Sequence, residues 1–157
     1  MIAGLILALL AAPEAPAERA QGDPWPGPGR YCGYATEIDL AEGETISTRR
    51  LGLHGAAFEW AGKFGTIEVR EINWASKPAG RPIHIDGIDR LQVVRVTRPG
   101  PGPTYALWSD EHLAAYVSGP AFRSKAAVAG ILRRIELVDH AGERSENCKY
   151  RTLFSWE

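Results

Sequence analysis

Apolar and polar residues alternate along most of this chain, the pattern of β-strands with one buried face. The clearest example closes the sequence. Cys148, Tyr150, Thr152, Phe154 and Trp156 share one parity, and a lysine, an arginine and a serine are among the residues between them. The last residues are therefore predicted to form a core strand rather than a loose tail.

The other expected strands are short, and glycine and proline punctuate them. They cover residues 32–40, 44–53, 58–60, 66–74, 91–96, 104–108, 112–118 and 135–139. Parity changes across Arg49 and Arg50 in the second of these, and again near Arg70, so a β-bulge is expected at each place. Residues 76–90 form the longest irregular stretch.

One segment has helical spacing instead. Val128, Ile131, Leu132 and Ile135 recur at i, i+3, i+4 and i+7, and Ser124 precedes them as an N-cap. The count of about eight short strands and one short helix near 123–134 predicts a mainly β fold, either a sandwich or a barrel. An α+β fold, with the helix packed on a sheet, is the alternative.

The amino terminus has the pattern of an export signal. Residues 2–12 are an unbroken run of small and apolar residues, which is shorter than the roughly 20 residues that a membrane-spanning helix needs. Ala15-Pro16-Ala17 then supplies an A-x-A cleavage pattern, although no lysine or arginine precedes the run. We expect a signal peptide at 1–17, with cleavage after Ala12 or an N-terminal core element as alternatives.

The segment that follows, ERAQGDPWPGPGR at 18–30, is rich in proline and glycine and has no periodicity, so it is predicted to be a linker. A single domain is expected over 31–157, with no transmembrane anchor after signal cleavage. The expected location is periplasmic or secreted.

The chain has two cysteines, and in an exported protein these are expected to pair. Cys32 opens CGYATEIDL and Cys148 opens CKYRTLFSW, and each pattern places its cysteine on the apolar face at the start of a strand. A Cys32–Cys148 disulfide would join the first and last strands. These strands would be parallel neighbours or lie in two stacked sheets.

Composition excludes some classes of partner. The 157 residues are 45% apolar and 24% charged, as in ordinary globular domains, and 18 Lys+Arg nearly balance 19 Asp+Glu. A dedicated nucleic-acid-binding protein normally carries a strong basic bias, so no nucleic-acid partner is expected.

Two polar groups are candidates for chemistry. His84 and Asp86 stand two residues apart in an extended segment, on one face, and Asp110 and His112 fall in an expected turn. If the two loops met, their imidazoles and carboxylates would suit metal binding or acid–base hydrolysis. The other interpretation is ordinary loop polarity that satisfies turn amides. No HExxH motif or Cys/His cluster is present, so neither a metal nor a cofactor is predicted.

Other catalytic motifs are missing from the sequence. Ser118 lies in VSGPAF rather than in a G-x-S-x-G elbow, and the glycine-rich segments are locked by proline. Trp60, Trp74 and Trp108 lie on or beside expected strands. They either pack in the core or form a platform on which sugar rings stack.

The sequence displays no motif that assigns a family. It favours a non-enzymatic envelope module that binds a small ligand, a glycan or a protein. The alternatives are a metal-dependent or acid–base hydrolase that uses His84, Asp86, Asp110 and His112, and a structural or inhibitory module whose function is its interface.

Overall fold

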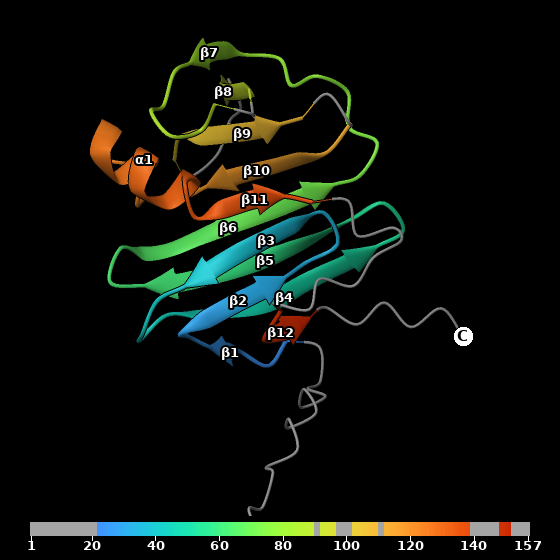
Figure 1. Ribbon diagram of the computed structural model, residues 1–157, viewed down its shortest axis with the longest axis vertical. Coiled ribbons are helices and arrows are strands. Elements are labelled where there is room, and N and C mark those ends of the chain that lie inside the picture. Colours follow the sequence, from blue (N-terminus) through green and yellow to red (C-terminus); the bar gives the residue numbers. More distant parts are fainter. Residues whose placement is uncertain (1–21, 90–91, 97–101, 110–111, 139–147, 152–157) are drawn as a thin grey trace, which may run out of the picture.

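The computed structural model describes residues 22–89, 92–96, 102–109, 112–138 and 148–151. Within these residues the chain forms two β-sheets and one helix (Figure 1). The mainly β prediction with one short helix is confirmed, and the sheets stay open rather than closing into a barrel. No helix in these ranges is long and apolar enough to span a membrane.

The larger sheet is antiparallel and has eight strands. Their spatial order is β1 (Trp25–Pro26), β4 (Thr45–Gly52), β5 (Gly55–Gly62), β6 (Gly65–Ile72), β10 (Ala114–Ser118), β9 (Thr104–Trp108), β8 (Gln92–Val96) and β7 (Arg81–Ile83). Hairpins with tight turns join β4, β5 and β6, and β7 lies inside the stretch expected to be irregular.

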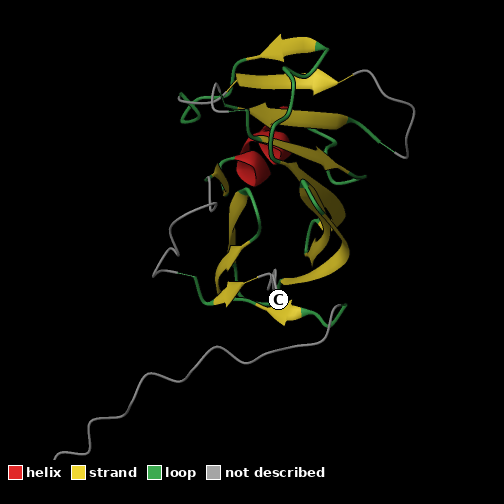
Figure 2. Cartoon of the chain, turned by 90° about the vertical axis from the view of Figure 1, so that its right-hand side faces the viewer, coloured by secondary structure: helices red, strands yellow, loops and turns green. Residues whose placement is uncertain are grey.

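The smaller sheet has four strands in the order β11 (Ile135–Leu137), β3 (Thr36–Leu40), β2 (Gly29–Cys32) and β12 (Tyr150–Arg151). The smaller sheet faces the larger one as a second layer, and the helix lies above it on the same side of the larger sheet (Figure 2). The other face of the larger sheet is open over β4, β5 and β6, where Glu68 and Arg70 are exposed, whereas Val94 and Ala106 on the same face farther along are buried.

Aromatic and aliphatic side chains fill the space between the sheets. Tyr31 of β2 meets Phe58 of β5 edge to face, with ring centroids 5.2 Å apart, and its hydroxyl lies 3.4 Å from the Thr48 hydroxyl. Both rings are fully buried. Burial of such rings is the main term that stabilises a small β domain.

The helix α1 (Lys125–Leu132) begins where the sequence predicts it. The Ser124 hydroxyl accepts a hydrogen bond from the Ala127 amide at 3.1 Å, which makes it the N-cap. Val128, Ile131 and Leu132 are buried against the core. The helix thus extends the layer that the smaller sheet begins.

The two bulge predictions have different outcomes. The register of β4 against β5 shifts between Thr48 and Arg50, so the first bulge is confirmed. The register of β6 is continuous with β5 and with β10, so the bulge predicted near Arg70 is wrong. The parity changes there because a core position carries Glu71, while Ile72 faces the other way.

The disulfide Cys32–Cys148 is present and joins the two ends of the domain. β12 follows Cys148 and pairs with β2 in parallel, with Tyr150 opposite Tyr31. One detail of the prediction is wrong, because Cys32 ends β2 instead of opening a strand. Residues 33–35 turn the chain before β3. Residues 152–157, expected to continue the last strand, lie outside the described ranges.

Part of the segment predicted as a linker belongs to the sheets. Trp25 of β1 is buried, and its ring centroid lies 4.9 Å from that of Tyr150. β2 begins at Gly29. The predicted signal peptide, residues 1–17, lies outside the described residues.

Candidate functional site

His84 and Asp86 form the pair that the sequence suggests, in open solvent. Their side chains meet at 3.1 Å between Nε2 and Oδ1, but they are 79% and 88% exposed. Ion pairs at such exposure contribute little to stability and do not by themselves make a reactive site. The Asp86 carbonyl accepts a hydrogen bond from Nε of Arg133 at 2.7 Å, which ties this loop to the end of α1.

Of the second predicted pair, the structure describes His112 alone, and among the described residues it does not join His84 and Asp86 in a group close enough to share a metal ion. Asp110 lies outside the described residues, and His112 is exposed in the turn between β9 and β10. A metal site needs several acidic, histidine or cysteine side chains close together. Among the described residues one such group of three is found, and it consists of Cys32, Glu37 and Cys148. Its sulfur atoms are joined in the disulfide. The hydrolase site therefore stays a prediction.

The three tryptophans of the possible sugar platform differ in exposure. Trp60 is fully buried, and its indole nitrogen donates to Glu44 at 3.0 Å. Trp108 is partly buried, with the Lys77 ammonium 5.7 Å from its ring centroid. Trp74 is 75% exposed. Of the three tryptophans, Trp74 alone is mostly exposed to solvent.

Trp74 is held in an unusual backbone conformation two residues after the end of β6. Its φ of 62° lies in the left-handed region, which costs a bulky residue about 1–2 kcal/mol. Two backbone hydrogen bonds fix the chain on either side: the Asn73 amide donates to the His54 carbonyl at 2.9 Å, and the Ala75 amide donates to the His112 carbonyl at 2.7 Å. His112 is also left-handed, with φ of 64°.

The indole of Trp74 stacks on the imidazole of His54, with ring centroids 5.2 Å apart and planes at 28°. Leu53, the neighbour of His54 in the β4–β5 turn, is 63% exposed. Leu53 and Trp74 are the large apolar side chains that stand exposed in the described part of the chain. We call Leu53, His54 and Trp74 the aromatic end.

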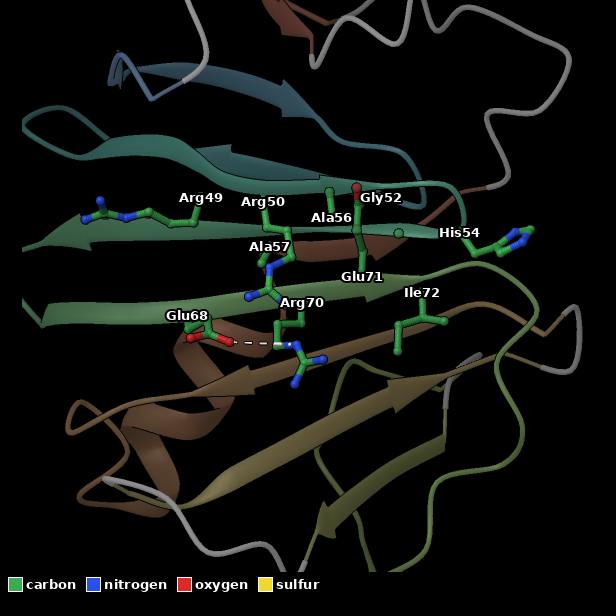
Figure 3. Close-up of a pocket in the computed structure, with 11 residues that line it drawn as sticks. Arg49, Arg50, Gly52, His54, Ala56, Ala57, Glu68, Arg70, Glu71 and Ile72 are labelled. Atoms are coloured by element: carbon green, nitrogen blue, oxygen red, sulfur yellow. Dashed lines mark ion pairs between the residues drawn. The ribbon is translucent and has the colours of Figure 1, made fainter.

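A hollow of about 570 Å³ lies next to the aromatic end, on the open face of the larger sheet (Figure 3). Its floor consists of small residues on β4 and β5, among them Gly52, Gly55 and Ala57. Its charged rim includes Arg49, Arg50, Glu68 and Arg70, and His54 lines it as well. The hollow and the aromatic end therefore share His54.

On the opposite face of β6, Glu71 is a residue that sequence reasoning missed. It is 1% exposed and accepts hydrogen bonds from the Tyr34 amide at 2.5 Å, the Ala35 amide at 2.9 Å and the Thr36 hydroxyl at 2.8 Å. Its carboxylate thereby holds the turn after Cys32. Burial raises the pKa of Glu71 to about 7, although these donors oppose the rise. The broken parity in β6 was the available signal.

A second buried carboxylate is stabilised in its charged form. Burial alone would raise the pKa of Glu44, but hydrogen bonds from Arg134, Ala41 and Trp60 outweigh it, so the pKa is lowered. Arg134 meets Glu44 at 2.5 Å and lies 4.7 Å above the Trp60 ring. This cluster anchors the end of α1 to β4 and β5 and has a structural role.

No family model, curated protein or solved structure matches this chain. A functional proposal therefore rests on the geometry of its own residues.

Proposed function

We propose that this protein is an exported, non-enzymatic β domain that binds a protein partner through the aromatic end. The observation that carries the proposal is Trp74, which is 75% exposed in a left-handed backbone conformation. An indole that stays mostly in water gains little free energy from burial on folding, and its backbone conformation costs energy. Strain of this kind is concentrated at functional sites, where binding compensates for it.

The composition of the aromatic end suits a protein interface. Tryptophan is the residue most enriched among interface residues that dominate binding energy, and Leu53 adds apolar area beside it. Stacking on His54 restricts the indole before a partner arrives. A side chain that is already ordered loses less entropy on binding, so the contact yields more net affinity.

A glycan partner fits this surface less well. A sugar-binding platform would use several exposed rings, whereas Trp60 is buried and Trp108 is partly covered. One face of the Trp74 ring is also occupied by His54. The adjacent aliphatic Leu53 offers a sugar no hydrogen bond, but it offers a protein an apolar contact.

The proposed location, periplasmic or secreted, is supported by two features of the chain. The Cys32–Cys148 disulfide is of a kind that persists in oxidising compartments. The apolar run at residues 2–12 and the A-x-A pattern after it have the form of a signal peptide.

Site-specific photo-crosslinking in the producing organism tests the proposal. A benzophenone amino acid at Leu53 should give one discrete crosslinked protein band, identified by mass spectrometry. The same probe at Lys125, exposed at the start of α1, serves as the control and should not give that band. Combining the Leu53 probe with Trp74→Ala should abolish the band. Absence of a discrete band at Leu53, or an identical band at both positions, would contradict the proposal.

A further inference from the structure

The open face of the larger sheet carries two neighbouring arginines that a regular strand would not place together. Alternation would turn one of Arg49 and Arg50 toward the core. The bulge between Thr48 and Arg50 leaves both exposed. Bulges often redirect side chains at binding sites. Here the bulge aims two guanidinium groups at solvent over the same sheet face.

Arg50 and Arg70 flank one small residue. In the register of the sheet Arg50 lies opposite Ala57, and Ala57 lies opposite Arg70 on the next strand. Two strand spacings, about 10 Å, therefore separate the arginine backbones. Figure 3 shows the Arg50 side chain laid across Ala57 toward β6, close to where Arg70 leaves its strand. Ala57 leaves the space between them open.

Acidic neighbours do not neutralise this pair fully. Arg49 forms an ion pair with Glu59. Arg70 is 3.8 Å from Glu68, at the outer limit for an ion pair, and both side chains are about half exposed. Arg50 has no ion-pair partner in the part of the chain that the structure describes. The hollow thus holds one unpaired guanidinium and one weakly paired one.

We propose that this hollow is a binding site for a small anionic ligand, with a carboxylate or phosphate group held between the guanidinium groups of Arg50 and Arg70. Guanidinium presents paired donors that match the oxygens of either group. A volume of about 570 Å³ accommodates a small molecule. His54 at the rim offers an additional ring nitrogen. The site goes beyond the proposed protein interface and does not depend on it.

The test is a titration of the full, disulfide-bonded chain with inorganic phosphate and, separately, with succinate, followed by ¹H–¹⁵N NMR. Sodium chloride keeps the ionic strength constant, because screening alone shifts exposed charges. Saturable shifts are expected at the amides of Gly55 and Ala57, with a dissociation constant in the range of about 1–10 mM for such small probes. Saturation by phosphate alone, or by succinate alone, identifies the anion and supports the site in either case.

Three variants decide whether the hollow is responsible. Arg50→Gln and Arg70→Gln should each weaken binding about tenfold. Ala57→Leu should block binding without a change of charge. The matched control is Arg95→Gln, which removes an exposed arginine from β8 and should bind within about twofold of the unchanged chain. Linear shifts without saturation by both anions, or an equal loss in Arg95→Gln, would overturn the proposal.

Discussion

Replacing Glu71 by glutamine is expected to remove a pH dependence of folding stability between about pH 5 and about pH 8. Glu71 is fully buried in β6, where amide and hydroxyl donors of residues 34–36 surround its carboxylate. Burial raises its pKa from 4.5 to about 7. The folded chain therefore binds one proton more than the unfolded chain between these two values.

The direction of the effect follows from that extra proton. Below pH 4.5 the group is protonated in both states, and its contribution to stability is fully present. As the pH rises toward about 7, the unfolded chain loses the proton first, and the folded state loses stability relative to it. The free energy of unfolding changes by about 1.4 kcal/mol for each pH unit over which the two states differ by one proton. It should therefore fall by about 3 kcal/mol between the two pKa values.

The assay is urea denaturation of the oxidised protein at several pH values between about 5 and 8, for the original chain and for Glu71→Gln. The variant is expected to be less stable by about 1–3 kcal/mol at the acid end, since an amide cannot accept from all the donors around it. Its stability should change little with pH. The difference in free energy of unfolding between the original chain and Glu71→Gln should therefore become smaller as the pH rises.

Glu68→Gln is the matched control, because Glu68 lies on the same strand with its side chain 54% exposed. Its stability profile should run parallel to that of the original chain. If Glu71→Gln and the original chain also had parallel profiles, the buried carboxylate would not titrate in this window and the reasoning would be refuted.

Three further substitutions separate structural from binding roles. Gly33→Ala should destabilise the fold by roughly 1–3 kcal/mol, because the added methyl group would overlap the Glu71 carboxylate; thermal unfolding measures this, and an unchanged midpoint would contradict the packing. Glu44→Gln should lower the free energy of unfolding by about 1–3 kcal/mol at neutral pH, because it weakens the pair with Arg134. This loss should vanish as the pH falls through the lowered pKa of Glu44, because the original carboxylate is then protonated too. A loss of stability that persists in acid would exclude this explanation. Trp74→Asn should change stability by less than about 1 kcal/mol, because asparagine tolerates left-handed φ; a loss above about 3 kcal/mol in chemical denaturation would show that Trp74 is structural.

The features of the fold that could be predicted were those that local pattern determines. The structure contains three such features: the N-cap at Ser124, the bulge at Arg49 and Arg50, and the Cys32–Cys148 disulfide. In each case the residues themselves carry the constraint: a hydroxyl before an apolar helical face, two adjacent charges that cannot enter a core, and two cysteines that pair with each other.

The features that were missed depend on tertiary contacts. The segment after Cys32 has strand periodicity, but the chain turns at residues 33–35 because Glu71 of another sheet binds the turn. Gly33 was the local sign of this close approach. A polar residue at a core position also led to a false bulge prediction in β6.

The candidate site was within reach of the sequence only in part. Trp74 was one of three tryptophans considered, and nothing in its neighbours along the chain distinguishes it from Trp60. Its exposure follows from the hydrogen bonds that hold residues 73–75 between two other turns. The hollow at Arg50 and Arg70 depends on strand register, which pairs residues far apart in the sequence.

The affinity of the crosslinked partner for the intact chain and for Trp74→Ala tests the central claim most directly. With the partner purified, isothermal titration calorimetry gives both dissociation constants. Removing an interface residue of this kind weakens the binding free energy by about 2 kcal/mol or more. The Trp74→Ala variant should therefore bind at least roughly 30-fold more weakly, while remaining folded. Equal affinities for the two chains would contradict the assignment of the aromatic end as the binding surface.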